Sequence, residues 1–357
     1  HRWQEQKQEV HWNDLQVYMR SSADKNIIVI AQTGMGKTEA GLLWLGNAKG
    51  FFTLPLKSAI NAIYERITHN IVLEKVDERI GLLHSDTYIK YLEQSEKYES
   101  LFPDTYYTKT RQLSLPLTIC TLDQIFDFVF RYRGFEQKLA TLSYSSVIID
   151  EVQMYSPELI AYLVLGLHYI TRMGGKFAIM TATLPTFFLD LLREQDIQIE
   201  TPRVFTNNII RHSLKVLDKE INAEDIAELS QQYGGKKILV ICNTVKSAVS
   251  IYRQLVNRMG GQQVRLLHGC FTKTDRALKE EQISEMGKKD NTECGVWVAT
   301  QIVEASLDLD FDLLFTELSD LNGLFQRMGR CYRHRTLDLA YNCFVFTGGN
   351  KRCSGVG

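Results

Sequence analysis

The stretch IIVIAQTGMGKT, residues 27–38, decides the fold, and the rest of the chain can be interpreted outward from it. Its first four residues are apolar and predict a buried strand, which runs directly into a turn that contains Gly34 and Gly36. Glycines in such a turn let main-chain N–H groups close around phosphate oxygens, and the helix that follows offers its positive N-terminus. Lys37 adds a positive charge and the Thr38 hydroxyl suits Mg²⁺, so the stretch predicts a nucleoside-triphosphate site that uses Mg²⁺.

Composition narrows the class of protein. The 357 residues are 45% hydrophobic, which predicts two domains that each bury a core. No apolar run is long enough to span a bilayer, and residues 1–9 resemble neither a signal peptide nor a transit peptide, so we expect a cytoplasmic protein without a membrane partner. Seven scattered cysteines form no Cys-x-x-Cys pair, so neither a disulfide framework nor a zinc site is expected. The formal charge of −1 excludes a generally cationic protein, and any nucleic acid must be held in a local groove.

Short apolar runs alternate with amphipathic stretches along the chain, which predicts an α/β fold with mostly parallel sheets flanked by helices. A helix is expected to begin with Ser156 as N-cap and Pro157 in its first turn, and to stop at Gly174-Gly175. Residues 201–211 lack clear periodicity, so we place a domain boundary there, between residues 1–205 and 206–357. Strands are expected at residues 27–31, 51–54, 80–84, 117–120, 147–150, 177–181, 237–242, 264–268, 296–299 and 341–346.

Two adjacent carboxylates end the strand expected at 147–150. Asp150 can hold Mg²⁺ through its water shell, while Glu151 can orient and deprotonate an attacking water. An isolated Asp-Glu pair after a strand is more often a solvated acidic loop. Its combination with Lys37 in one α/β domain favours the catalytic interpretation.

The stretch QRMGRCYR, residues 326–333, carries the third chemical signal. A helix here would place Gln326, Arg330 and Arg333 on one face, where several donors could reach one anion. An arginine finger contributes on the order of 10³ to 10⁵ in turnover, so a second domain that supplies one can switch hydrolysis on by closing. The alternative is an ordinary basic surface helix. Gly329 argues against it, because a glycine inside a helix lowers its stability and indicates close backbone approach.

Together these motifs resemble those of superfamily 2 helicases, which contain two tandem RecA-like domains. The residues TAT at 181–183 are similar to the motif that couples hydrolysis to domain movement. The run TQIVEASLD at 300–308 has the spacing of motif V, which implies that Asp308 contacts the nucleotide and Thr300 the nucleic-acid backbone. Within the superfamily the strongest resemblance is to the CRISPR-associated helicase of type I systems, and it is carried by GKTEA at 36–40, LPLKSA at 54–59, DEV at 150–152 and EASLDLDFD at 304–312.

The resemblance implies an ATP- and Mg²⁺-dependent motor, with motifs I to III in the first domain and IV to VI in the second. It also implies movement along single-stranded DNA from 3′ to 5′, after recruitment to the guide-RNA surveillance complex Cascade. Gln153 stands where the family usually has His, and the adenine-selecting glutamine is ambiguous among Gln4, Gln6 and Gln16. The family's nuclease domain is built on an adjacent His-Asp pair, and no such pair occurs in the sequence. We therefore expect the HD nuclease to be a separate protein or a domain outside this chain.

Nucleic-acid contacts are expected at strand ends in both domains, where hydroxyls and main-chain amides can hold phosphates without reading bases. By position these residues are Thr53, Pro55, Lys57, Thr121, Asp123, Asn243, Thr244, His268, Gly269 and Thr300. Binding of this kind is sequence-independent and sensitive to salt. The alternatives are helix caps, for Thr121 and Thr244 in particular, and strand-end packing for His268 and Gly269.

Our hypothesis is that ATP binds between the two domains and that closure brings Arg330 and Arg333 to the γ-phosphate held by Lys37. An RNA-remodelling helicase is the first rival, although DEVQ and TAT fit the Asp-Glu-Ala-Asp pattern poorly. The second rival is a non-hydrolysing nucleotide clamp or scaffold. Loss of Glu151 or of the arginines would mark such a clamp, and all of them are present.

Overall fold

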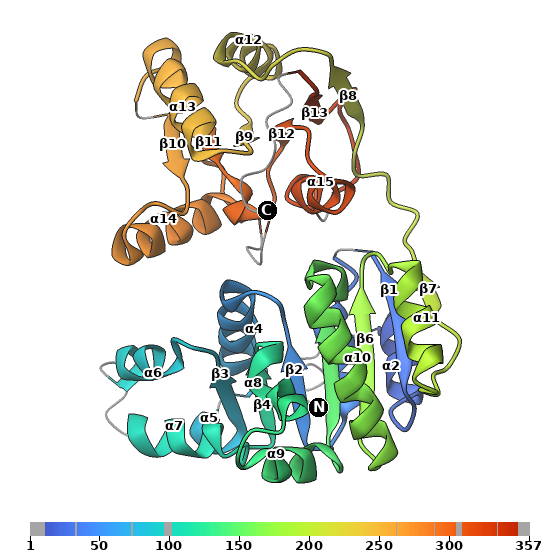
Figure 1. Ribbon diagram of the computed structural model, residues 1–357. Helices are drawn as coiled ribbons and strands as arrows, with labels where there is room; N and C mark the ends of the chain where they lie inside the picture. Colours follow the sequence, from blue (N-terminus) through green and yellow to red (C-terminus); the bar gives the residue numbers. More distant parts are fainter. Residues whose placement is uncertain are drawn as a thin grey trace. The chain divides into compact units, whose positions relative to one another are not determined.

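The computed structural model describes residues 11–32, 34–72, 74–95, 102–261, 263–288, 290–304, 309–333 and 335–348. The chain divides into two compact units, His1–Asn207 and Asn208–Gly357 (Figure 1). Each unit is an α/β fold built on a parallel sheet, so the predicted fold class is confirmed.

The first unit holds a seven-stranded sheet with the order β3-β4-β2-β5-β6-β1-β7, in which all pairings are parallel. Its strands are β1 (Ile27–Ala31), β2 (Gly50–Thr53), β3 (Ile80–Leu83), β4 (Leu117–Cys120), β5 (Ser146–Asp150), β6 (Lys176–Thr181) and β7 (Arg203–Phe205). Its helices are α2 (Asp14–Ser21), α3 (Lys37–Leu45), α4 (Lys57–Asn70), α5 (Val76–Arg79), α6 (Thr87–Ser95), α7 (Pro103–Arg111), α8 (Leu122–Phe126), η1 (Asp127–Phe130), α9 (Phe135–Leu142), η2 (Val152–Met154), α10 (Pro157–Arg172) and α11 (Thr186–Glu194).

Helices cover both faces of this sheet, because successive residues of each apolar strand point to opposite sides. Ile28 packs with α8, α9, α10 and α11 in one core. Ile27 and Val29 pack with α2, α3, α4, α6 and α7 in the other. The expected start of α10 is confirmed, since Ser156 caps the helix by accepting a hydrogen bond from the Leu159 amide at 3.3 Å.

The second unit holds a six-stranded parallel sheet with the order β10-β11-β9-β12-β13-β8. Its strands are β8 (Leu214–Leu217), β9 (Lys237–Ile241), β10 (Val264–Leu267), β11 (Gly295–Ala299), β12 (Leu313–Glu317) and β13 (Cys343–Phe346). Its helices are α12 (Ala223–Tyr233), α13 (Val245–Met259), α14 (Lys273–Met286), η3 (Gln301–Val303) and α15 (Leu321–Met328). Helices α12 and α13 pack on one face of the sheet, and α14 and α15 pack on the other.

Three strands are missing from the sequence prediction. β7 and β8 are edge strands whose residues are largely exposed, so the apolar run that predicts a buried strand is absent. β12 is fully buried, but its apolar run of three residues stands between Asp312 and the Thr316-Glu317 pair. The segment 201–211, predicted to be an irregular boundary, contains β7, which pairs with β1 and so belongs to the first sheet.

Candidate functional site

The loop between β1 and α3 is shaped by two glycines with left-handed backbone angles. Gly34 has a φ of 85° and Gly36 a φ of 75°, and Lys37 is the first residue of the nine-residue helix α3. A Cβ at Gly36 would lie 3.0 Å from Nε2 of Gln16. The loop therefore requires glycine at position 36 for its conformation and for close packing. It also places the positive N-terminus of α3 at the end of β1.

Side chains on both sides fix this loop. Asn13, the N-cap of α2, donates from Nδ2 to the Met35 carbonyl at 2.9 Å. Gln32 accepts a hydrogen bond from the Asn207 amide at 3.1 Å, so residues from both ends of the unit hold the loop. Thr33 lies outside the described residues.

Gln16 is the candidate adenine-selecting glutamine that the structure describes, because Gln4 and Gln6 lie outside the described residues. Its Oε1 accepts from the Asn13 amide at 3.2 Å, and its Nε2 lies beside Gly36. Gln16 is thus next to the phosphate-binding loop, where a contact to the base of a nucleotide is feasible. Its role in selecting adenine stays a prediction.

Lys37 connects the loop to the two carboxylates. Its Nζ donates to Oε1 of Glu151 at 2.6 Å and lies 3.7 Å from Oδ1 of Asp150. β1 and β5 are separated in the sheet by β6, so a parallel topology brings together residues 114 positions apart. The structure therefore assembles Lys37, Asp150 and Glu151 at the carboxyl edge of the first sheet, as predicted.

Asp150 is the buried member of the pair, with 5% of its surface exposed. Burial raises the pKa of its carboxyl group to about 7; the Lys37 ammonium opposes this shift and the Glu151 charge adds to it. Two carboxylates thus share one ammonium, an arrangement that a divalent cation would stabilise. Asp150 and Thr38 offer the oxygen donors that Mg²⁺ prefers, so the residues present fit that ion.

Glu151 has a φ of 54°, and its amide donates at 3.0 Å both to the Met180 carbonyl and to Oδ1 of Asp150. Its second carboxylate oxygen accepts a hydrogen bond from Nε2 of Gln153 at 2.5 Å. The side-chain Oε1 of Gln153 in turn accepts from the Thr181 hydroxyl. A continuous path therefore runs from Lys37 through Glu151 and Gln153 to Thr181, at the end of β6.

The prediction of a helix across residues 326–333 is wrong. α15 ends at Met328, and Gly329 is its C-cap. The chain then turns, because the Phe311 amide donates to the Arg330 carbonyl at 2.9 Å and the Tyr332 amide donates to the Phe311 carbonyl at 3.0 Å. Gln326 stands on the helix, whereas Arg330 and Arg333 lie on the following loop, so helical spacing does not place these three on one face.

The loop that carries the two arginines is fixed by acidic neighbours. The Arg333 amide donates to Oδ1 of Asp310 at 3.0 Å, and Nη2 of Arg330 donates to the Glu304 carbonyl. Arg335 pairs with Asp310 at 2.9 Å and with Asp312 at 2.6 Å. Ion pairs and hydrogen bonds thus replace the predicted helix in positioning Arg330 and Arg333.

Sequence reasoning missed Arg327, which is fully buried. It donates to Glu304 at 2.6 Å, to the Thr316 hydroxyl at 2.8 Å and to the Asn243 amide oxygen at 2.9 Å. It therefore joins α15 to the ends of β9, β12 and η3. Its position beside Gln326 in the sequence could have marked Arg327 as a candidate, but only the tertiary fold shows that its side chain faces inward.

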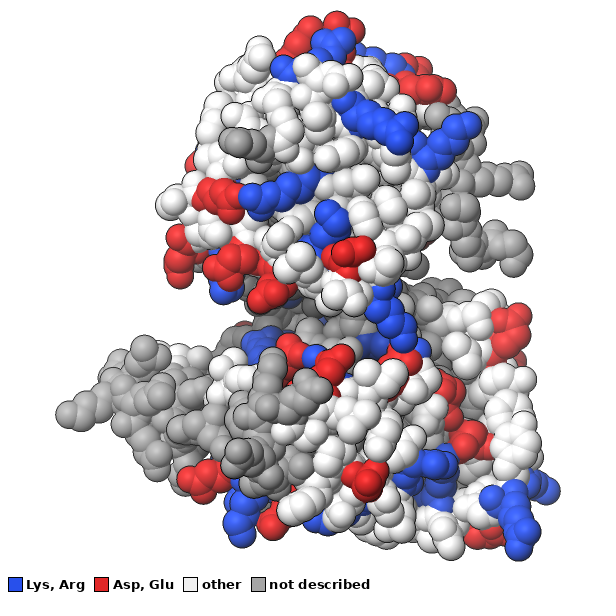
Figure 2. Space-filling view, turned by 90° about the vertical axis from the view of Figure 1, so that its left-hand side faces the viewer, with Lys and Arg blue, Asp and Glu red and all other residues white. Residues whose placement is uncertain are grey.

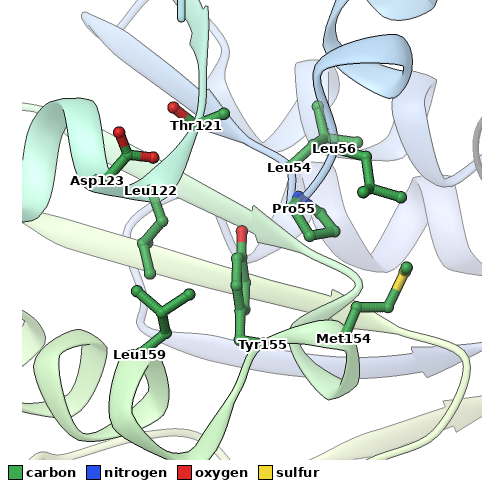
Figure 3. Close-up of a pocket in the computed structure, with 9 residues that line it drawn as sticks. All are labelled: Leu54, Pro55, Leu56, Thr121, Leu122, Asp123, Met154, Tyr155 and Leu159. Carbon is green, nitrogen blue, oxygen red and sulfur yellow. The ribbon is translucent and has the colours of Figure 1, made fainter. Parts of the chain in front are cut away.

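The nucleic-acid candidates of the first unit separate into two groups. Thr53 is fully buried and its hydroxyl donates to the Ile148 carbonyl at 3.0 Å, so that hydroxyl does not face solvent, and a role for Thr53 in nucleic-acid binding stays a prediction. Lys57 is exposed and pairs with Asp86 at 3.0 Å. Pro55, Thr121 and Asp123 line a pocket at the carboxyl ends of β2 and β4 (Figure 3). Thr121 is the N-cap of α8 but makes no capping bond with its side chain.

The candidates of the second unit stand at the ends of β9, β10 and β11, which are neighbours in the sheet. Thr244 caps α13 by accepting from the Ser247 amide at 3.1 Å, which is the alternative considered for it. His268 is buried and stacks on Phe271 with ring centres 4.3 Å apart, and Gly269 is exposed. The side chains of Asn243 and Thr300 are also buried, and the Thr300 amide donates to the Leu267 carbonyl at 3.3 Å, so their part in nucleic-acid binding stays a prediction. Asp308 lies outside the described residues.

Figure 2 shows that, on the face in view, Lys and Arg residues alternate with Asp and Glu residues and do not merge into one basic surface. Among the described residues, no group of three or more His, Cys, Asp or Glu side chains is arranged to hold a metal ion. The described helices include none with the length and apolar character needed to cross a bilayer.

Comparisons with known proteins agree with this geometry. Residues 13–191 match the sequence model of the DEAD/DEAH box helicases, and residues 234–336 match that of the C-terminal part of the CRISPR-associated nuclease/helicase Cas3. The CRISPR-associated nuclease/helicase Cas3 of Methanothermobacter thermautotrophicus is 30% identical over 350 residues, which cover 92% of this chain and 41% of that protein. The chain thus spans about two fifths of the length of this curated relative.

Two solved structures show the same fold. The crystal structure of T. fusca Cas3 with ATP superposes with a TM-score of 0.77 at 20% identity, covering 96% of this chain and 46% of that one. A structure described as a CRISPR RNA-guided surveillance complex, pre-nicking, gives a TM-score of 0.65 at 21% identity, covering 94% of this chain and 45% of that one.

The matched sequence models and the assembled motifs define the class: the chain belongs to the DEAD/DEAH box helicases. Within that class it is Cas3-like, and the part of such a protein that it spans is the helicase part.

Proposed function

We propose that this chain is an ATP-dependent motor that moves along single-stranded DNA from 3′ to 5′ and acts in type I CRISPR interference. The observation that carries the proposal is the meeting of Lys37, Asp150 and Glu151 at one sheet edge, beside a glycine loop and a helix N-terminus. Such a constellation supports phosphoryl transfer to water, because the reaction requires charge neutralisation and one oriented base.

In this proposal Lys37 and the amides around Gly34 and Gly36 hold the phosphates of ATP. Asp150 and Thr38 would hold Mg²⁺, which supplies positive charge to the phosphate oxygens. Glu151 takes a proton from the water that attacks the γ-phosphorus, while the bond to the oxygen shared with the β-phosphate breaks and leaves ADP. Phosphates compete with Glu151 for the Lys37 ammonium, so ATP binding would release one carboxylate oxygen for this water.

The second unit completes the motor. We assign residues 1–205 and 206–357 to two RecA-like domains, with ATP between them and with Asp308 in contact with the nucleotide. Gln326, Arg330 and Arg333 would approach the γ-phosphate when the domains close. Hydrolysis would then let the two domains open, and the residues of one domain that bind the DNA would advance relative to those of the other.

The relatives support the cellular role. They are named as CRISPR-associated nuclease/helicases, and one structural neighbour is described as part of a guide-RNA surveillance complex. We propose that this chain is recruited to Cascade after strand displacement, and that it acts with an HD nuclease supplied outside these 357 residues.

ATP turnover measured with single-stranded DNA, with single-stranded RNA and without polymer tests the proposal. We expect stimulation by DNA and loss of all turnover in Lys37→Ala. Stimulation by RNA alone would favour an RNA-remodelling helicase, and ATP binding without turnover would favour a nucleotide-dependent scaffold. Displacement of a protein block from the 5′ end but not from the 3′ end of a single strand would test the direction.

A further inference from the structure

A pocket of about 130 Å³ lies at the carboxyl edge of the first sheet, on the β2 and β4 side (Figure 3). The phosphate-binding loop follows β1, which is separated from β2 by β5 and β6, so the pocket is a distinct place on the same sheet edge. Its lining comes from the ends of β2 and β4 and from the segment after Glu151, and consists of Leu54, Pro55, Leu56, Thr121, Leu122, Asp123, Met154, Tyr155 and Leu159.

The hydroxyl group of Tyr155 is the unusual feature of this pocket. Tyr155 is 7% exposed, and its oxygen is buried without a hydrogen-bond partner among the described residues. Burial raises the pKa of Tyr155, and the nearby Thr53 hydroxyl, which donates its own proton to the Ile148 carbonyl, opposes part of that rise. Figure 3 shows the Tyr155 hydroxyl directed between Leu122 and Pro55, into the pocket. Because an unmade hydrogen bond at a buried group is costly, this hydroxyl is suited to a ligand that accepts from it.

The pocket has the size and walls of a site for one aromatic ring. An apolar cavity of about 150 Å³ holds a benzene molecule, so the volume here fits a single six-membered ring and not two fused rings. Leu54, Leu122 and Leu159 provide apolar contacts for the faces of such a ring. Met154 adds a polarisable thioether, which contacts aromatic rings favourably.

The polar groups at the rim favour a base over a phosphate. Asp123 is exposed and carries a carboxylate, which repels phosphate but accepts hydrogen bonds from ring N–H or amino groups. Thr121 contributes a hydroxyl that can donate or accept. Together with the Tyr155 hydroxyl these groups can meet the alternating donors and acceptors along the edge of a pyrimidine.

We infer that this pocket binds one pyrimidine base of the single strand, with the base ring between the leucines and its edge on Tyr155, Thr121 and Asp123. The inference rests on the proposed function and refines it. Contacts to the phosphates of the DNA do not distinguish one base from another. This pocket would therefore add a preference for pyrimidines at one position of a binding site that is otherwise independent of sequence.

The test compares equilibrium binding of fluorescent oligo(dT), oligo(dC) and oligo(dA) of equal length to the full chain and to Tyr155→Phe at fixed salt. The substitution keeps the ring and removes only the hydroxyl. We expect the ratio of the Kd for oligo(dA) to the Kd for oligo(dT) to fall roughly three- to tenfold in the variant, the effect of one hydrogen bond. Differences in stiffness between the oligonucleotides affect both proteins equally and cancel from this comparison. Tyr132→Phe, which alters an exposed tyrosine of the same unit, should leave the ratio unchanged.

Thermal unfolding provides the structural readout. Because the Tyr155 hydroxyl lacks a partner among the described residues, Tyr155→Phe should leave the Tm unchanged or raise it, whereas a purely structural hydroxyl would lower it. An unchanged Kd ratio in Tyr155→Phe, or equal Kd values of the parent chain for all three oligonucleotides, overturns the pocket assignment. DNA-stimulated ATP turnover in the same protein would still support the proposed motor function. Absence of any DNA binding would instead overturn the proposed function together with this inference.

Discussion

The Nζ atom of Lys37 lies 2.6 Å from the Oε1 atom of Glu151, so the cation of the glycine loop and the carboxylate that follows β5 are directly hydrogen-bonded. Gln153 contacts the other oxygen of the same carboxylate at 2.5 Å. Glu151 is thereby held between the group expected to bind phosphate and the end of β6. This arrangement allows a change at the nucleotide to reach the Thr181 segment through side-chain contacts.

Glu151→Gln should lower the turnover number for ATP by about 10² to 10⁴, the usual contribution of a general base, while ATP binding persists. The amide keeps the shape of the side chain but cannot take a proton from water. Steady-state turnover combined with equilibrium binding of a fluorescent ATP analogue checks this. Glu158→Gln, at an exposed position on α10, is the matched control. Unchanged turnover in the Glu151 variant would remove it as the base.

Gln153→Ala should abolish most of the DNA stimulation of ATP turnover and preserve ATP affinity, because it breaks the path between Glu151 and Thr181. Gln153→His should restore a large part of the stimulation, since imidazole can also bridge two oxygen atoms in its protonated form. ATP turnover measured with and without single-stranded DNA in both variants tests this prediction. Equal stimulation in Gln153→Ala and the parent chain would show that the coupling takes another route.

Arg327→Met should destabilise the second unit by about 3 to 5 kcal/mol, because it removes the fully buried guanidinium and leaves the partly buried Glu304 carboxylate without this ion pair. Burial already raises the pKa of Glu304, and the Arg327 charge opposes that rise. Urea unfolding measures the loss. Arg253→Met on the exposed face of α13 should change the stability by less than about 0.5 kcal/mol. Equal stability of the two variants would contradict a stabilising role for the hydrogen bonds and ion pair of Arg327.

Arg333→Ala should reduce ATP turnover by on the order of 10³ to 10⁵ if this residue serves as an arginine finger, with little change in the unfolding temperature. Arg333 is only partly buried, and its main-chain amide, which the substitution preserves, bonds to Asp310. Arg335→Ala gives a useful contrast, because it removes two ion pairs and should lower both the turnover and the stability. Full turnover in Arg333→Ala would leave Arg330 as the candidate finger.

Stability should fall as the pH drops through the range in which histidine titrates. Burial lowers the pKa of His84, whose Nδ1 accepts from the Asp86 amide at 3.1 Å and whose Nε2 contacts the Asn61 amide oxygen at 2.9 Å. The unfolded chain binds a proton near pH 6.5, above the folded pKa, so the contribution of neutral His84 is complete above about pH 6.5 and is lost below it.

His84→Gln should therefore flatten the dependence of the urea midpoint on pH between about 7.5 and 5. His69→Gln, at an exposed position on α4, should leave that dependence as it is. Identical pH profiles for the parent chain and His84→Gln would show that other groups cause the acid destabilisation.

Local sequence determined the elements whose physical cause is local. The run at 27–31 is apolar at every position and forms β1 within the predicted bounds, because a strand buried on both faces needs no partner-specific pattern. Ser156 and Pro157 start α10 as expected, since a cap depends on residues within one turn. The glycines of the loop after β1 and the Asp150-Glu151 pair are likewise identified as candidates by short-range spacing, and the structure brings Lys37 of that loop to both carboxylates.

Tertiary structure decided whatever depends on residues distant in sequence. Helical spacing failed at residues 329–333 because backbone bonds to Phe311 bend the chain after Met328. Thr53 and Arg327 became internal because neighbouring strands and helices enclose them, and no local pattern reports that enclosure. The Tyr155 pocket exists because three segments end at the same sheet edge. The sequence by itself therefore determined the phosphate-binding chemistry, while only the packing of distant segments decided which neighbouring side chains support it and which face outward.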